Sequence, residues 1–229
     1  MTFEAADLKS QIVTGCAIMS EQGLVEGFGH LSARLLGDRI LMTPRKALGL
    51  VGADELLTLD MQGNVLEGAG RPAVETAMHL AIYRRRADVQ AIARTHSRAC
   101  AVFSASNRSV QAVHRFGCHL GAEVPVYPDF ALVGSPDLGD TVAEFLGDRA
   151  AVLLRANGTL VTGPSLIEAV MRAIWLEESA TIQLAALSAG LTPHAFSAED
   201  AARAATMDMP HEPQRAWEFY AALASGDIV

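Results

Sequence analysis

The segment from residue 150 to residue 187 constrains the fold of this chain most tightly. An apolar run over 150–154 is followed by the turn Asn157-Gly158 and by a second short apolar run over 159–161. An Asn-Gly pair between two apolar runs is a strong hairpin signal, because both residues take positive φ at low cost. A long helical pattern then begins after Ser165, which is a suitable N-cap. The segment therefore predicts a buried hairpin followed closely by a long helix.

Short strands and amphipathic helices alternate along the rest of the chain. Apolar residues recur at helical spacing over 5–22, and short apolar runs at 31–35 and 40–42 are typical of strands. The other expected elements are a hairpin over 56–66, a helix from Pro72 to about Arg85, a strand over 89–93, a helix from Arg98 to about Ala105 capped by Ser97, a helix near 138–146, and one or two helices after Pro193. We therefore expect a single α/β or α+β domain over residues 1–229, with a C-terminal helical tail from about residue 191.

Composition excludes several classes of protein. Of 229 residues, 50% are hydrophobic and 19% are charged, which is typical of a globular domain rather than a disordered chain. The formal net charge of -8 argues against broad nucleic-acid binding, which needs a positive field. No apolar run reaches the length of about 18 residues that a membrane-spanning helix needs. The cysteines at 16, 100 and 118 are scattered and odd in number, so we expect free thiols and a cytoplasmic protein.

Two residues invite a chemical interpretation. Glu75 lies near the start of a predicted helix, and His96 lies at the end of a predicted buried strand. Such element ends are where binding and catalytic sites are often assembled. Together the two residues could supply a carboxylate and an imidazole to a metal or to proton transfer. The alternative is that Glu75 only complements the helix dipole and that His96 only ends the strand.

Basic residues occupy similar strand-end positions, namely Arg45, Arg94, Arg115 and Arg155. Arginine there is suited to bidentate recognition of a carboxylate or phosphate, although each could instead pair with a surface acid. The chain has no Walker loop, dinucleotide fingerprint or nucleophile elbow.

Five segments, taken in order, resemble one known family. They are Gly29–Arg34, Met42-Thr43-Pro44, Pro72 to Glu75 with its extension to His79, Ile92–His96, and Leu153–Gly158. In this order they resemble the class II aldolase/adducin family from about residue 6 to residue 190. The resemblance implies a three-layer α/β domain whose central, mainly antiparallel sheet is flanked by helices. It also implies a homotetramer with active sites between subunits, and the chain looks nearer to the family's aromatic-acid decarboxylase branch.

The resemblance also implies a metal site, but the ligand positions differ. Aldolases of this family bind a divalent metal, often zinc, through three histidines beside a glutamate. The matching positions here hold Arg94, His96 and Asn157, with Glu75 retained. Two of the three imidazoles are therefore missing, and the positive charge of Arg94 would repel a cation.

Three functions follow from these observations. The first is a lyase that breaks a carbon–carbon bond of a small anionic, carboxylated substrate by decarboxylation or retro-aldol cleavage, with Glu75 or His96 moving the proton. Its other expected site residues are Arg115 as a catalytic residue and Gly29, His30, Arg45, Lys46, Arg94, Arg155 and Asn157 as substrate-binding residues. The second is an aldolase in which Glu75 and His96, joined by His30 or His114, hold zinc, manganese or a similar metal. The third is a non-catalytic assembly module of the adducin type.

Overall fold

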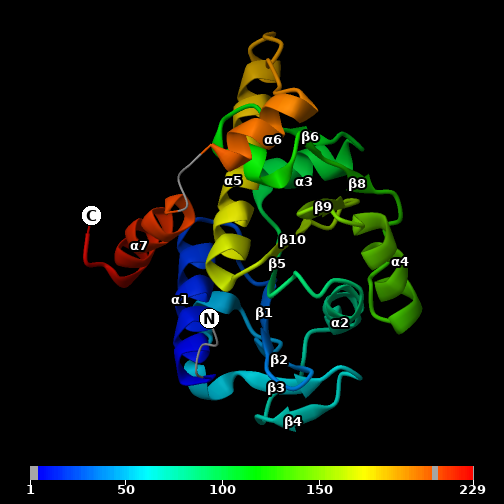
Figure 1. Cartoon of the computed structure of the whole chain (residues 1–229), viewed down its shortest axis with the longest axis vertical. Helices are drawn as coiled ribbons and strands as arrows, with labels where there is room; N and C mark the ends of the chain where they lie inside the picture. Colours follow the sequence, from blue (N-terminus) through cyan, green and yellow to red (C-terminus); the bar gives the residue numbers. More distant parts are fainter. Residues whose placement is uncertain (1–4, 208–210, 229) are drawn as a thin grey trace.

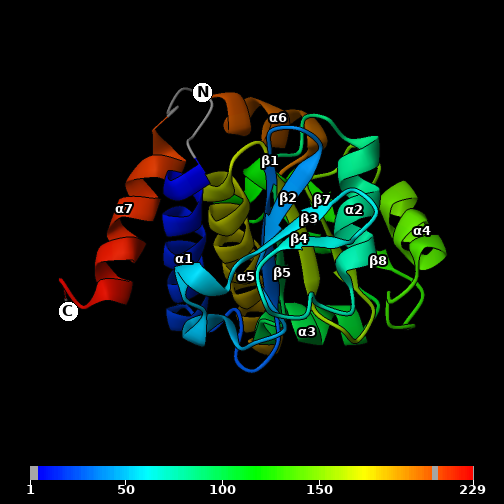
Figure 2. The ribbon, with the colours of Figure 1, turned by 90° about the horizontal axis from the view of Figure 1, so that it is seen from below.

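The computed structural model describes residues 5–207 and 211–228, and it places one large sheet between two layers of helices (Figure 1). The helices α1 (Ala5–Glu21) and α5 (Leu166–Ser188) cover one face, and α2 (Thr76–Arg85) and α4 (Pro136–Leu146) cover the other (Figure 2). Each face has its own buried apolar core. This arrangement confirms the predicted α/β fold with a central sheet flanked by helices.

The large sheet has eight strands in the described residues, in the order β4-β3-β2-β1-β5-β10-β9-β8. Their bounds are β1 His30–Leu35, β2 Arg39–Met42, β3 Leu57–Asp60, β4 Val65–Glu67, β5 Ala91–Thr95, β8 Val126–Tyr127, β9 Ala151–Leu154 and β10 Thr159–Gly163. Neighbouring strands are antiparallel except for the parallel pair β8 and β9. The sheet is therefore mainly antiparallel, as predicted, and the hairpins at Gly63 and Asn157-Gly158 form as expected.

The central strand β5 determines which residues can meet at the site. Ala91 and Ala93 face the core under α1 and α5, whereas Ile92 faces the core under α2 and α4. Because side chains alternate along a strand, Arg94 lies on the same face as Ile92, toward α2. In the antiparallel register of β1 with β5, His30 lies directly opposite Arg94.

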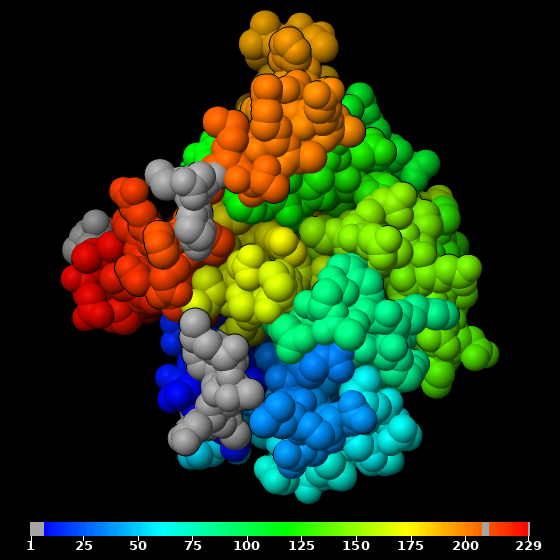
Figure 3. Space-filling view, viewed as in Figure 1, coloured from blue at the N-terminus to red at the C-terminus, as the bar shows by residue number. Residues whose placement is uncertain are grey.

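Smaller elements complete the fold. They are η1 (Leu48–Leu50), η2 (Ala53–Glu55), α3 (Arg98–Ala105), η3 (Phe116–Leu120), the small sheet of β6 (Val110–Gln111) and β7 (Glu123–Val124), and the tail helices α6 (Ala198–Thr206) and α7 (Glu212–Ser225). In the space-filling view α6 lies over the segment that contains η3 (Figure 3). None of the described helices has both the length and the apolar character of a membrane span.

One predicted helix start and one predicted helix cap were wrong. The helix expected from Pro72 begins only at Thr76, because Pro72 forms an isolated antiparallel bridge with Pro44 instead. Ser97 occupies the N-cap position of α3, but its side chain makes no capping hydrogen bond. Glu177 of α5 provides the cap, since its carboxylate accepts from the backbone N–H groups of residues 99 and 100 at 2.7 and 3.0 Å. The Ser165 cap of α5 is confirmed, because its hydroxyl accepts from the N–H of Glu168.

The aromatic residues of the tail divide between core and surface. Trp217 on α7 is buried in the core formed with α1 and α5. Phe219 is 55% exposed. The Tyr220 hydroxyl donates to Glu178 at 3.5 Å. The three cysteines are free and buried, as expected.

A packing prediction concerns the contact between α2 and α4. A Cβ added to Gly139 would lie 2.6 Å from the carbonyl oxygen of Ala77, so α4 would have to move away from α2. We expect Gly139→Ala to lower the free energy of unfolding by about 1–3 kcal/mol, as overpacking does in other cores. Urea unfolding measures the change. Gly52→Ala is the control, because its Cβ would meet nothing closer than 3.6 Å. Equal stability of the two variants would contradict this view of the α2–α4 contact.

Candidate active site

Glu75 lies at the point where four segments of the chain meet. It directly precedes α2, while Arg94 comes from β5 and His30 from the start of β1. Asn157 comes from the turn between β9 and β10. Four of the residues expected from the sequence to form the site are therefore neighbours in space.

The carboxylate of Glu75 accepts hydrogen bonds from three directions. Oε2 accepts from Nε of Arg94 at 3.1 Å and lies 3.4 Å from Nε2 of His30, and Oε1 lies 3.5 Å from Nδ2 of Asn157. The side chain of Arg94 is fully buried and that of Glu75 is 8% exposed. A buried charge needs a partner of opposite sign, and here Glu75 and Arg94 neutralise each other.

The guanidinium of Arg94 is held by more than Glu75. Its Nη1 donates to the carbonyl oxygens of Thr95 and Thr159, at 2.6 and 3.3 Å. Its Nη2 is buried and has no hydrogen-bond partner among the residues that the structure describes. Because buried donors are nearly always satisfied in proteins, this nitrogen is suited to receive an oxygen of a bound molecule.

Two glycines are required for this close packing. Gly158 has a φ of +78°, and a Cβ there would collide with the carbonyl of Thr95 and approach Arg94 to 2.8 Å. Gly29 has a φ of +138°, and a Cβ there would collide with Val25. Gly29, which the sequence suggests as a substrate-binding residue, thus has a conformational role at the start of β1.

Burial and charge set the protonation states. Burial by itself would raise the pKa of Glu75, but the His30 hydrogen bond and the Arg94 charge outweigh it and lower the pKa to about 2. Burial and the Arg94 charge lower the pKa of His96 to about 4. Burial also lowers the pKa of His30. At neutral pH the site therefore holds one carboxylate, one guanidinium and uncharged imidazoles.

His96 and Asn157 are the partly exposed members of the group. His96 follows β5, and its backbone N–H donates to the carbonyl of Leu24 at 2.9 Å. Its ring is half-buried and packs edge-on against Phe28, with ring centroids 6.2 Å apart. Phe28 itself is 77% exposed, so this side of His96 faces solvent.

The other basic residues expected at the site do not contact Glu75 in the described part of the chain. Lys46 is exposed and pairs with Glu55 at 2.7 Å, and the adjacent Arg45 is exposed as well. Arg155 is exposed and donates to the carbonyl of Pro128 at 3.2 Å. A single copy of the chain therefore does not gather several arginines around Glu75, as the sequence had led us to expect. Among the arginines that the structure describes, only Arg94 contacts Glu75, because the other strand ends lie at different parts of the surface.

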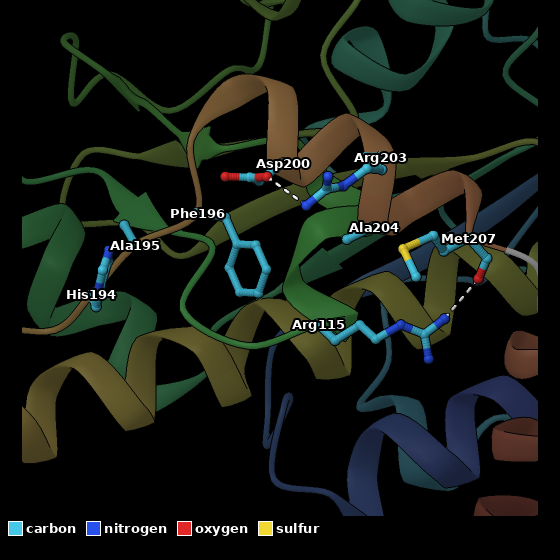
Figure 4. A pocket seen from close by; sticks show the side chains of 8 residues that line it. All are labelled: Arg115, His194, Ala195, Phe196, Asp200, Arg203, Ala204 and Met207. Carbon is cyan, nitrogen blue, oxygen red and sulfur yellow. Dashed lines mark hydrogen bonds and ion pairs between the residues drawn. The ribbon is translucent and has the colours of Figure 1, made fainter.

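Arg115 belongs to a different pocket. It pairs with Glu212 at 2.6 Å and donates to the carbonyl of Met207 at 2.8 Å. It lines a cavity of about 480 Å³ against α6, in which Arg203 pairs with Asp200 (Figure 4). Each of the two guanidinium groups in this cavity thus already has an acidic partner.

The donor set around Glu75 does not fit a divalent metal. No group of three or more His, Cys, Asp or Glu side chains within the described ranges could hold an ion. The Glu75 carboxylate is already used by Arg94, whose fixed positive charge would repel a cation. His114, considered from the sequence as an alternative ligand, lies near the carbonyl of Trp175 instead, at 3.3 Å. The structure thus gives no support to a metal held by Glu75 and His96.

Sequence reasoning missed three polar residues behind the site. Ser32, His79 and Tyr83 are buried and hydrogen-bonded in a row that begins at His30. A signal was present, because Glu75, His79 and Tyr83 are spaced four residues apart and so lie on one helical face. The contact with Ser32 depends on how β1 sits against α2, which this spacing does not reveal.

Comparison with known proteins identifies the family. Residues 10–184 match the class II aldolase and adducin N-terminal domain, and the chain belongs to this family. An L-fuculose phosphate aldolase of Methanocaldococcus jannaschii is 31% identical over 177 residues, which are 77% of this chain and 95% of that protein. A 3,4-dihydroxyphthalate decarboxylase of Arthrobacter keyseri is 28% identical over 227 residues, which are 93% of this chain and 92% of that protein.

A solved structure of an L-fuculose 1-phosphate aldolase agrees with this assignment. It superposes with a TM-score of 0.79 at 26% identity, over 89% of this chain and 97% of that one. This chain is thus similar to enzymes that are named aldolase and decarboxylase, and both names denote lyases. The comparisons therefore support an enzyme of the lyase class.

The lowered pKa of His96 predicts a pH-dependent stability. Since its folded-state pKa is about 4 and its unfolded value is 6.5, the unfolded chain binds more protons between these values. The associated stability is fully present above pH 6.5 and is lost as the pH falls toward 4. The shift corresponds to at most about 3 kcal/mol, and partial exposure of the ring reduces this to about 1–2 kcal/mol.

We expect His96→Gln to lose less stability than the wild type between pH 7 and pH 4.5. Urea unfolding at the two pH values measures this difference. His194→Gln, which replaces an exposed histidine outside the site, is the control. If His96→Gln lost as much stability in acid as the wild type, the pKa of His96 would not be lowered in the folded protein.

The donor set also predicts metal content. Elemental analysis of untagged protein purified without a chelator should find well under one divalent metal per chain. The double substitution Arg94→His and Asn157→His removes the repelling charge and supplies two imidazoles, so it should acquire stoichiometric zinc. Arg155→His with Asn64→His, at exposed positions, is the matched control. Stoichiometric metal in the wild type would contradict the fit argument.

Proposed function

We propose that this protein is a lyase that breaks a carbon–carbon bond of a small carboxylated substrate, with decarboxylation as the favoured reaction. One observation carries the proposal. The buried Nη2 of Arg94 has no partner among the described residues, and it belongs to a guanidinium that is held against ionised Glu75 near half-exposed His96. In this proposal a substrate oxygen would be the acceptor for this nitrogen.

Arg94 supplies a positive charge that cannot move. Its Nε and Nη1 are fixed by Glu75 and by two backbone carbonyls, so little reorganisation is needed when negative charge develops nearby. The amide nitrogen of Asn157 lies at the opposite carboxylate oxygen of Glu75 and offers a second donor. A substrate with a carboxylate or an enolisable carbonyl group would use both.

His96 is suited to move the proton. Its low pKa keeps the ring uncharged at neutral pH, so it can accept a proton from a substrate hydroxyl group. When the carbon–carbon bond breaks, CO2 leaves in a decarboxylation, whereas in a retro-aldol cleavage the deprotonated hydroxyl carbon leaves as an aldehyde. The electron pair of the broken bond passes to the carbonyl oxygen of the remaining fragment as an enolate, which the Arg94 charge stabilises. The imidazolium of His96 then returns the proton to carbon. Glu75, with a pKa of about 2, serves mainly as the fixed negative partner of Arg94.

The choice between decarboxylation and retro-aldol cleavage rests on how much of this chain aligns with each named enzyme. The decarboxylase from Arthrobacter keyseri aligns over 227 residues, whereas the aldolase from Methanocaldococcus jannaschii aligns over 177. Because the longer alignment covers 93% of this chain, it supports decarboxylation of a small hydroxylated aromatic acid as the first candidate. Retro-aldol cleavage is the second candidate, since the aldolase has the higher identity and the same His96 chemistry would serve it.

The quaternary structure belongs to the same proposal. We infer a homotetramer with sites between subunits, as the family resemblance implies. The exposed Arg45, Lys46, Arg115 and Arg155 would then act on the substrate of a neighbouring subunit. The three buried free thiols support a cytoplasmic protein.

The test is a screen of small mono-, di- and tricarboxylates, including hydroxylated aromatic acids, by thermal shift and by release of CO2 or of an aldehyde. For a turned-over substrate, we expect His96→Gln and Glu75→Gln each to lower kcat about 100-fold or more, as loss of acid–base or positioning groups does elsewhere. Glu144→Gln, at an exposed position on α4, is the matched control.

Binding gives a second readout. An acid that raises Tm in the wild type should lose that effect in Arg94→Met and be weakened in Asn157→Ala, with circular dichroism as the check on folding. Full activity of Glu75→Gln on every acid would refute the catalytic assignment. If no acid binds or reacts, a non-catalytic module of the adducin type becomes the better explanation.

A further inference from the structure

A single row of buried polar groups runs from Glu75 into the core between α2 and the sheet. Nε2 of His30 faces Glu75 at 3.4 Å, and Nδ1 of His30 lies 2.7 Å from Nε2 of His79. Nδ1 of His79 lies 2.7 Å from the hydroxyl of Ser32, which lies 2.9 Å from the hydroxyl of Tyr83. These five residues are called the Glu75–Tyr83 chain below. All of them are at most 6% exposed.

The Tyr83 end determines which atom donates in each bond. The phenol has one hydrogen, and Ser32 is its only hydrogen-bond partner among the described residues. Tyr83 must therefore donate to Ser32, because a buried O–H group without an acceptor is costly. Ser32 in turn must direct its own hydrogen to Nδ1 of His79.

The remaining bonds follow from the two imidazoles. When Nδ1 of a neutral His79 accepts from Ser32, its proton is on Nε2, and it donates to Nδ1 of His30. Neutral His30 then has its proton on Nε2, where it faces Glu75. The Glu75 end gives the same direction independently, since Arg94 and Asn157 offer this carboxylate only N–H groups and favour its ionised, accepting form.

We propose that Ser32, His79 and Tyr83 are positioning residues of this site, which hold His30 as the neutral Nε2–H form directed at Glu75 through hydrogen bonds that all point the same way. This inference rests on the proposed function, because these residues matter for catalysis only through an ionised, oriented Glu75 that holds Arg94 in place.

Burial supports this assignment. It lowers the pKa of His79 well below the ordinary value, and the charges of His30 and Arg94 act in the same direction. Protonation of His30 on Nδ1 would reverse every bond beyond it and leave the Tyr83 hydroxyl without an acceptor in the described core. The need of the Tyr83 hydroxyl for an acceptor thus disfavours a second proton on His30.

The experiment observes the imidazole nitrogens directly and needs no substrate. Long-range 1H–15N spectra of 15N-histidine-labelled protein at pH 7 would be assigned with His30→Gln and His79→Gln. In the wild type we expect Nε2 to be protonated and Nδ1 to be unprotonated on both rings. A proton on Nδ1 of either ring, or a charged His30, would overturn the proposal.

Two variants separate positioning from simple packing. His79→Leu replaces the imidazole with an apolar side chain of similar bulk and removes the donor. The 15N resonance of Nδ1 of His30 should then shift toward the frequency of a nitrogen without a hydrogen bond. His79→Gln restores an N–H donor and should move that signal back. An unchanged Nδ1 signal of His30 in folded His79→Leu would refute the positioning role.

Ser32→Ala tests the row at another point and stands in if His79→Leu does not fold. It should shift Nδ1 of His79, whereas Ser104→Ala, which alters another fully buried serine, should not. Equal spectra for these two variants would also refute the proposal. Because these spectra are independent of turnover, a missing lyase activity and a wrong hydrogen-bond direction give separate results.

Discussion

The structure around the site depends on one buried ion pair. Arg94 on the central strand and Glu75 at the start of α2 are joined at 3.1 Å, and the guanidinium is completely buried. Breaking such a pair by removing one partner commonly costs about 3–5 kcal/mol, because the other charge stays buried. The pair also connects the sheet to the helical layer that carries the His79 and Tyr83 side chains. Together with the His30 hydrogen bond, it also gives Glu75 its low pKa.

The same pair determines the electrostatics of the site. One carboxylate and one guanidinium cancel, and burial keeps the neighbouring imidazoles uncharged. A family that usually places a divalent metal near this glutamate has here a fixed organic cation instead. A guanidinium can stabilise an enolate and can bind a carboxylate with two parallel hydrogen bonds, but it cannot exchange its ligands as a metal does. Under the proposed function, Arg94 would stabilise the developing charge and His96 would move the proton.

Much of the fold could be predicted because the signals were local. The turn between β9 and β10 needs a positive φ at Gly158, and Ser165 can cap α5 from within its own segment, so neighbouring residues decide both features. The predictions that failed involved partners far along the chain. Pro72 pairs with Pro44 instead of opening α2, and α3 is capped by Glu177, nearly 80 residues away from the helix start. A local pattern contains no information about such partners.

The sequence by itself determined the family-like order of segments and the alternation of strands and helices, and it pointed to Glu75, Arg94, His96 and Asn157 as candidate site residues. It could do so because strand ends, turns and charge types are written in short stretches of chain. The tertiary structure alone decided that Arg94 is buried against Glu75, that Arg45, Arg115 and Arg155 lie elsewhere, and that Ser32 reaches His79. The physical reason is the register of β1 with β5 and the packing of α2 on the sheet, which bring together residues about 20 to 80 positions apart.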